Sequence, residues 1–319
     1  MTLLALARHL AFAAALAVLS AVLVRAMIAV GVMDTPDARK AHSRPTPKSG
    51  GVGIVVAFLV GVSLLYRYAD FARLADPYFR GVILAAAAIA LVAFLDDLRD
   101  WPFTVKLAAQ IAAGLAAIGS GLYVRDFRIP YAGPVPIGWL GPPASLLWVL
   151  FATNAMNFVD GLNGLASGVA LIASLFLAAI AVTHGGGFAY AACGLLAAGI
   201  AGFLPFNFPT ARIFMGDVGS QFCGFMLAVL AVVAGRFDGV SLSFLLVPML
   251  LTGVLYDVAF TLVRRTWDGE RITHAHRGHL YQVAHRTGMT ATAVTLIHWG
   301  FTVFGGLCCL VFIAAPSTL

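Results

Sequence analysis

Two adjacent carboxylates mark the end of one long apolar stretch. Asp96 and Asp97 follow directly on the run from Gly81 to Leu95. An ionised carboxylate at the edge of a membrane-like segment is costly unless a cation or water satisfies it, and neighbouring carboxylates also repel each other. A hard divalent cation such as Mg²⁺ relieves that repulsion, because it takes oxygen ligands and keeps waters and substrate phosphates in its shell. The pair predicts a cation site, with a solvated helix cap as the plainer alternative.

A second polar cluster recurs at every third residue, through Asn154, Asn157, Asp160 and Asn163. This spacing keeps successive side chains near one face of a helix. In a membrane helix such a stripe should face protein, water or ligand rather than lipid. It indicates either a polar site or an asparagine ladder that joins helices.

A third cluster surrounds Asp217, which lies between Gly216 and Gly219 at the start of another apolar run. The glycines let backbone N–H groups approach an anion, or let the carboxylate turn toward a metal. A helix N-cap is the alternative interpretation.

A fourth cluster holds His276 and His279, three residues apart. Two such histidines could bind zinc, but no matching third and fourth ligand stands near them in the sequence. Neighbouring Arg277 favours an anion site, because arginine pairs well with phosphate oxygens.

The elements that must position these clusters are membrane helices. The chain has 319 residues, of which 61% are hydrophobic and 11% charged, and its mean hydropathy is +0.94. This composition excludes a water-soluble chain and predicts an all-α polytopic integral membrane protein with one transmembrane domain over residues 1–319. About ten spans are expected, near residues 10–32, 50–66, 80–95, 103–121, 143–158, 162–183, 188–206, 218–235, 241–263 and 290–314.

The basic residues set the expected orientation. Loops after odd-numbered spans hold twelve Lys and Arg, against seven on the other face, so the former should be cytoplasmic and both termini outside. Ten of the fourteen acids share that basic face, which indicates a cytoplasmic site for both a metal and anionic groups. The outer loop from Leu122 to Gly141 fits a short hairpin or an interfacial segment better than a helix.

Taken in order along the chain, the motifs resemble those of the polyprenyl-phosphate N-acetylhexosamine-1-phosphate transferases, of the glycosyltransferase family 4 type. The basic loop from residue 34 to 53, the aspartate pair, the Asn/Asp-Gly run, the Phe-Met-Gly-Asp-x-Gly-Ser run and the His-rich loop follow in family order. The resemblance implies transfer of a sugar 1-phosphate from a UDP-activated N-acetylated sugar to polyprenyl phosphate, with release of UMP. It also implies Mg²⁺, with Mn²⁺ as a substitute.

The resemblance also implies a role for each matching residue. Asp96, Asp97 and Asp217 would be catalytic, and Asp217, Asn157 and Asp97 would hold the metal. Asp160 would meet the uridine. Diphosphate or sugar would be held by His276, Arg277 and His279, and phosphate by Arg44 and Lys48. Asp257 also falls in a family-like stretch, where a structural or gating role is favoured over a catalytic one.

Two departures bear on the subfamily. Asn163 stands where many members have Asp, and the last loop reads His-Ala-His-Arg-Gly-His rather than three consecutive histidines. The last-loop difference, together with the Arg-Lys-x-His motif at Arg39, Lys40 and His42 in the first loop, resembles the bacterial enzymes that initiate O-antigen and related surface glycans. A phospho-N-acetylmuramoyl-pentapeptide transferase of peptidoglycan synthesis is the alternative within the family, and a secondary transporter the alternative outside it. The expected location is the bacterial inner membrane, with the bilayer and the two substrates as partners, no nucleic acid, and a homodimer as one open arrangement.

Overall fold

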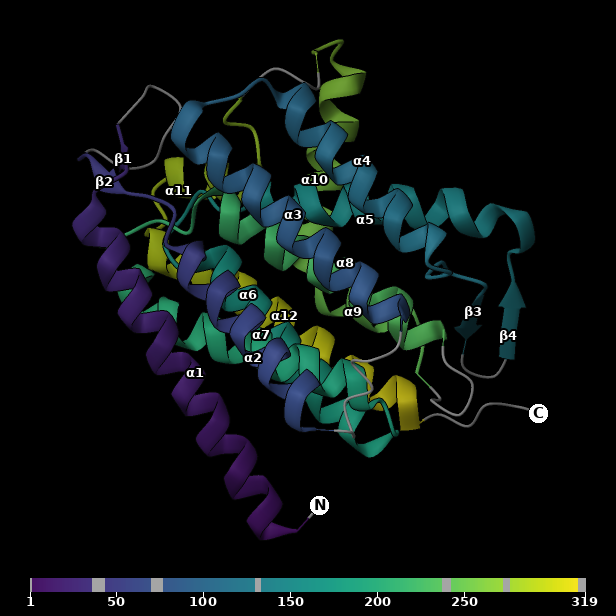
Figure 1. The fold of residues 1–319 in the computed structure, drawn as a ribbon. Helices are drawn as coiled ribbons and strands as arrows, with labels where there is room; N and C mark the ends of the chain where they lie inside the picture. Colours follow the sequence, from purple (N-terminus) through teal and green to yellow (C-terminus); the bar gives the residue numbers. More distant parts are fainter. Residues whose placement is uncertain are drawn as a thin grey trace.

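The computed structural model describes residues 2–35, 44–69, 77–129, 133–236, 242–271 and 276–314. Within them the chain forms a helical bundle with two small hairpins (Figure 1). The helices are α1 (Leu3–Val30), α2 (Gly51–Tyr68), α3 (Pro77–Arg99), α4 (Phe103–Gly119), α5 (Gly141–Phe158), α6 (Leu165–Thr183), α7 (Gly187–Asn207), α8 (Gly216–Arg236), α9 (Leu246–Leu250), α10 (Thr252–Trp267), α11 (Leu280–Arg286) and α12 (Ala291–Ala314).

The prediction of a helical polytopic membrane protein is confirmed. Among the described helices, seven are long and apolar enough to cross a membrane, namely α1, α2, α3, α6, α7, α8 and α12, and α4 is a shorter apolar helix. The ten predicted runs all fall on helices, but the ninth is broken at Leu251 into α9 and α10. The number of spans therefore stays a prediction.

The hairpins lie at opposite ends of the bundle (Figure 1). Strands β3 (Asp126–Ile129) and β4 (Gly133–Pro136) pair antiparallel, which confirms the hairpin predicted in the loop from Leu122 to Gly141. Strands β1 (Met33–Asp34) and β2 (Thr46–Pro47) pair antiparallel at the other end, beside the start of α2.

Helix α8 forms the centre of the bundle and is almost entirely buried. Small residues let its neighbours approach closely, as is common between membrane helices. A Cβ added at Gly51 of α2 would lie 2.3 Å from the Cα of Gly219, and one added at Gly224 would lie 2.9 Å from the Cα of Thr153 on α5. These contacts bring the first turn of α8 against α2 and its body against α5.

The polar clusters meet because several helices begin or end at one end of the bundle. Helices α3 and α5 end there, and α8 begins there, as the contacts of Asp97 and Asn157 with Asp217 show. The segment before α8 is tied to the β2 strand by the bond from Phe214 N to Pro47 O at 2.8 Å, and Gly50 N donates to Phe214 O at 2.9 Å. The start of α8 is thereby fixed before any side chain of the site is placed.

Candidate active site

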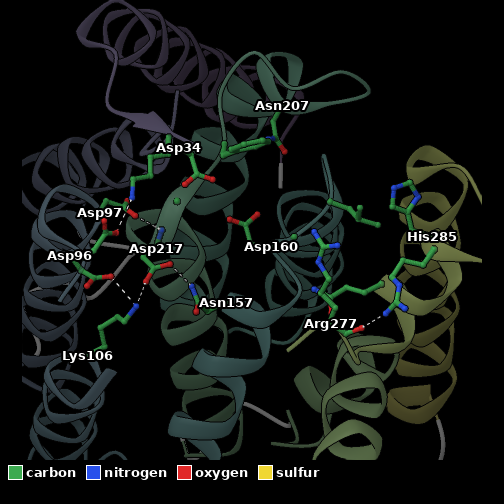
Figure 2. Close-up of a pocket in the computed structure, with 18 residues that line it drawn as sticks. Asp34, Asp96, Asp97, Lys106, Asn157, Asp160, Asn207, Asp217, Arg277 and His285 are labelled. Atoms are coloured by element: carbon green, nitrogen blue, oxygen red, sulfur yellow. Dashed lines mark hydrogen bonds and ion pairs between the residues drawn. The ribbon is translucent and has the colours of Figure 1, made fainter. Parts of the chain in front are cut away.

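A cavity of about 540 Å³ opens at this end of the bundle (Figure 2). It brings together residues from the basic loop, the aspartate pair, the Asn/Asp-Gly run, the start of α8 and the segment around α11. Its lining comprises Asp34, Lys48, Asp96, Asp97, Asp100, Lys106, Asn157, Asp160, Gly161, Leu162, Asn207, Phe214, Gly216, Asp217, Arg277, Gln282, His285 and Arg286.

Lys106 is the cation at the centre of the acidic wall. Its Nζ lies 2.9 Å from Asp96 Oδ2 and 2.9 Å from Asp217 Oδ2 (Figure 2). The Lys106 and Asp217 side chains are about one-fifth exposed, and Asp96 is buried. A charged group this far from bulk water is costly unless it is paired, so one ammonium between two carboxylates lowers the cost of holding all three there.

Asp97 holds the first turn of α8 although it belongs to α3. Its Oδ1 accepts from Asp217 N at 3.1 Å, and its Oδ2 accepts from Val218 N at 3.4 Å and from Ser49 Oγ at 3.0 Å. The carboxylate satisfies N–H groups that the helix leaves unpaired, and its charge complements the helix dipole. Gly216, with φ of 72°, leaves room for it, since a Cβ there would lie 2.5 Å from Asp97 Oδ2.

Asn157 fixes the other side of Asp217. Its Nδ2 donates to Asp217 Oδ1 at 2.9 Å and to Ser220 Oγ at 2.9 Å. Among the described residues, no hydrogen bond is made to the side-chain amide oxygen of Asn157, and the residue lines the cavity. Asp217 thus accepts an amide hydrogen bond on one oxygen and the Lys106 ammonium on the other.

A ladder of side-chain amides continues below Asp217 into the bundle. Gln221 Nε2 donates to Asp217 Oδ2 at 3.2 Å, and Gln110 Nε2 donates to Gln221 Oε1 at 3.1 Å. Asn154 Nδ2 then donates to Gln110 Oε1 at 2.7 Å. Asn154 therefore joins helices, as the ladder interpretation proposed, whereas Asn157 and Asp160 reach the cavity.

Asp160 lies between the two walls of the cavity, in the corner after α5 (Figure 2). Burial, and then the charges of Asp217 and Asp97, raise the pKa of its carboxyl well above the usual range. The raised pKa favours the protonated, neutral form of this carboxyl.

The facing wall is basic and comes from the segment around α11. Arg277, Gln282, His285 and Arg286 line it, and Arg286 Nη1 donates to Arg277 O at 3.2 Å. Arg277 and His285 appear across the cavity from Lys106 and Asp96 in Figure 2. An anion that enters the cavity would lie between these cations and the acidic wall.

Other predicted site residues lie at its edge or outside it. Lys48 lines the cavity and lies 3.5 Å from Asp100, while Arg44 is exposed and does not line it. His279 is buried against Asp257 at 3.1 Å. His276 also lies off the lining, and burial, then the charges of His279 and Arg265, lower its pKa to about 4. The Arg-Lys-x-His motif and His274 fall outside the described residues.

Sequence reasoning did not single out Lys106, Gln110 or Gln221. Lys106 was visible as a lone charge inside the apolar run from 103 to 121, a position that by itself indicates function. The two glutamines gave no comparable signal, because their pairing depends on how α4 and α8 pack.

The oxygen donors of the acidic wall fit Mg²⁺. The carboxylates of Asp96 and Asp217 and the amide of Asn157 meet there, and the two carboxylates flank a single ammonium. Within the described ranges, no group of three or more His, Cys, Asp or Glu could enclose a metal. The Asp217 carboxylate and the Asn157 amide fit Mg²⁺, because this ion usually takes one or two carboxylates and completes its shell with water and substrate phosphates.

Comparison with known proteins identifies the family. Residues 79–235 match the family model described as Glycosyl transferase family 4. The chain is also 32% identical to the decaprenyl-phosphate N-acetylglucosaminephosphotransferase of Mycobacterium tuberculosis (strain ATCC 25618 / H37Rv), over 89% of this chain and 77% of that protein. The chain belongs to glycosyl transferase family 4. As a family 4 member it is a membrane-embedded phospho-sugar transferase, so the predicted family and enzyme class are confirmed.

Other family 4 relatives differ in what their names say they act on. The probable undecaprenyl-phosphate N-acetylglucosaminyl 1-phosphate transferase of Bacillus subtilis (strain 168) is 28% identical over 90% of this chain and 80% of its own. The phospho-N-acetylmuramoyl-pentapeptide-transferase of Acetivibrio thermocellus (strain ATCC 27405 and equivalents) is 30% identical over 87% and 84%. Similarity to these relatives therefore does not by itself identify the donor sugar.

Proposed function

We propose that this enzyme transfers N-acetylglucosamine 1-phosphate from UDP-N-acetylglucosamine to undecaprenyl phosphate or a similar polyprenyl phosphate. The observation that carries the proposal is the cavity in which Asp96, Asp217 and Lys106 face Arg277 and Arg286. It opens where membrane helices end, so a water-soluble nucleotide and a lipid phosphate can meet in it. Relatives named for N-acetylglucosamine transfer favour that sugar.

The reaction exchanges one phosphorus–oxygen bond for another. An oxygen of the polyprenyl phosphate attacks the sugar-bearing phosphorus of the UDP-sugar, a new P–O bond forms, and the bond to the UMP oxygen breaks. UMP leaves with the electron pair, and the anomeric centre of the sugar is untouched. The acceptor is largely ionised near neutral pH, since a second phosphate pKa is about 6, so a general base is optional.

Repulsion between the two anions is the main barrier, so positioning and cationic stabilisation supply most of the catalysis. Arg277 and Arg286 would bind the diphosphate from the basic wall, and Lys48 would add positive charge at the rim. Asp96 would act as an electrostatic organiser, because its carboxylate holds Lys106 in place. Asp160, between the walls, would meet the uridine.

Asp217 and Asn157 would hold Mg²⁺, with Asp97 behind them. When bound, the cation neutralises diphosphate charge and orients the leaving UMP. The oxygens of Asp97 already accept hydrogen bonds from α8 and Ser49, so its part in the proposal is to fix Asp217.

We further propose that the cavity faces the cytoplasm of a bacterial cell, with both termini outside, and that the product starts O-antigen or a related envelope glycan. The twelve-to-seven distribution of basic residues supports the orientation. The absence of three consecutive histidines in the last loop argues against the peptidoglycan reaction.

The test is UMP release by purified protein in detergent, with undecaprenyl phosphate, Mg²⁺ and a panel of UDP-N-acetyl sugars. Release that requires both lipid and metal, and is fastest with UDP-N-acetylglucosamine, is expected. Preference for UDP-N-acetylmuramoyl-pentapeptide would assign the peptidoglycan reaction instead. No release with any donor, from protein shown to be folded, would exclude a transferase and favour a transporter.

An Asp217→Asn variant is the matched check on the site. It keeps the size of the side chain and the contact with Asn157 but removes the charge that Lys106 neutralises. UMP release should fall by at least about 100-fold, since interactions at transferring phosphoryl groups are worth several kcal/mol. Solute uptake that survives this change would instead point to transport.

A further inference from the structure

Asp257 holds the start of α11 from inside the bundle. It lies on α10, is 1% exposed and is not part of the cavity lining. Its Oδ1 accepts from His279 Nδ1 at 3.1 Å and from Leu280 N at 2.9 Å, and its Oδ2 accepts from Tyr281 N at 2.9 Å. One buried carboxylate therefore binds three consecutive residues.

A second residue of α10, Arg264, also binds the segment that precedes α11. Arg264 Nη2 donates to Gly278 O at 2.7 Å. Arg264 is seven residues, or about two helical turns, after Asp257, so both side chains leave the same face of α10. Arg277, which lines the cavity, comes directly before Gly278 in the chain, and α11, which starts at these contacts, carries Gln282 and Arg286 of the basic wall.

Tyr281 connects the start of α11 to the end of α5. Its hydroxyl donates to Phe158 O at 2.9 Å, and its side chain is buried. The contact depends on Gly161, because a Cβ added there would lie 2.2 Å from Tyr281 Oη. Asp160 lies between Phe158 and Gly161 in the chain. The contacts of Asp257 and Tyr281 therefore connect the basic wall to Asp160.

We propose that Asp257 is a positioning residue that sets the separation of the two cavity walls through His279 and Tyr281. The inference rests on the proposed function, because what Asp257 positions is the nucleotide-sugar site. Asp257 acts through other residues and meets no substrate. Displacement of a substrate-positioning group by about 1 Å can cost on the order of 100-fold in rate, so a remote carboxylate can matter this much.

The first test compares Asp257→Asn with Thr261→Val. Asn keeps one acceptor oxygen and loses the other, so the N–H of Tyr281 or the donors from His279 and Leu280 lose their partner. Thr261 Oγ1 donates to the same Asp257 Oδ1 at 3.3 Å and is equally buried, but it belongs to α10 and does not reach the wall. KM for the UDP-sugar should rise about tenfold in Asp257→Asn, corresponding to ~1.4 kcal/mol of lost binding, and stay within about twofold in Thr261→Val.

A purely structural role would give another pattern. Loss of folded enzyme lowers the apparent kcat in proportion, whereas KM does not depend on the amount of active protein. An unchanged KM in Asp257→Asn would therefore overturn the inference.

The second test separates positioning by His279 from direct contact with substrate. His279→Asn keeps a nitrogen donor near the place of Nδ1, and His279→Phe keeps the ring but removes the donor. The Asn variant should retain KM within about threefold, while the Phe variant should match Asp257→Asn. Equal loss in both variants would mean that the imidazole acts on substrate itself, against the inference.

A third measurement does not depend on turnover. Amide hydrogen exchange should accelerate in residues 276–286 and also in residues 158–164 of Asp257→Asn, and in neither segment of Thr261→Val. Unchanged exchange in both segments would overturn the inference even if activity fell. If wild-type protein released no UMP while this coupled exchange persisted, the proposed function would fail and the positioning network would stand.

Discussion

Lys106 shows how one residue can set the electrostatics of the site. Its ammonium is shared between Asp96 and Asp217, at 2.9 Å from each. Without it, these carboxylates would face each other across a partly buried space with no fixed positive charge between them. The repulsion would displace Asp217 from Asn157 and from the position in which it can hold a cation.

Lys106→Met should therefore reduce kcat/KM for UMP release by about 100-fold or more, because removing one partner leaves buried charges uncompensated. Arg99→Gln is the matched control: Arg99 is a basic residue at the end of α3 whose guanidinium stacks on Trp101 and which does not line the cavity. Steady-state kinetics in detergent would measure both. Equal losses of kcat/KM in the two variants would show that activity depends on the overall positive charge of this end of the bundle rather than on the Lys106 bridge.

At the level of elements, the site depends on how α8 begins. Asp97 from α3 accepts the first N–H groups of α8, and Gly216 precedes them in a left-handed backbone conformation. The helix start, the metal-binding carboxylate and the aspartate pair are thereby one unit. A change at the glycine should disturb all three together.

Gly216→Ala should lower the free energy of unfolding by about 1–3 kcal/mol, because an L side chain is strained at φ of 72° and would meet Asp97. Gly194→Ala, on α7, is the matched control, since a Cβ there meets nothing within 4 Å. That change should be neutral or slightly stabilising. Thermal unfolding in detergent would compare them, and a Tm for Gly216→Ala at or above the wild-type value would contradict this account.

Apolar periodicity predicted most of the helices, and five acidic or amide residues of the predicted site line one cavity, while their roles stay predictions. Asp96, Asp97, Asn157, Asp160 and Asp217 meet in space because each stands at a helix end, and apolar periodicity locates helix ends. The position of His279 was not predictable in this way, because its orientation depends on Asp257, which is in a different helix. The break at Leu251 did have a signal in the sequence, because Pro248 lies three residues before it and Gly253 two residues after it, and both residue types disfavour a continuous helix.

At the scale of the whole molecule, the polar site lies at one end of an apolar bundle. The β1–β2 hairpin lies at the end where α8 begins, and the β3–β4 hairpin at the other (Figure 1). The nucleotide can therefore approach from one side of the membrane only. The proposed orientation makes that side the cytoplasm.

Sealed membrane vesicles would test this sidedness. Inverted vesicles, with the cytoplasmic face outward, should release UMP from added UDP-N-acetylglucosamine at full rate. Right-side-out vesicles should do so only after permeabilisation, because a nucleotide sugar does not cross the bilayer. The opposite result would place the cavity on the outer face.

Lys106 and the first N–H groups of α8 also mean that the enzyme carries its own counter-charges. Lys106 bridges Asp96 and Asp217, and the first N–H groups of α8 bind Asp97. We expect EDTA to abolish UMP release while leaving Tm within about 2 °C of its value in Mg²⁺, a shift worth less than ~1 kcal/mol. A large fall in Tm would show that the metal is needed for folding. A small change would show that these internal counter-charges, rather than the cation, hold the fold around the site.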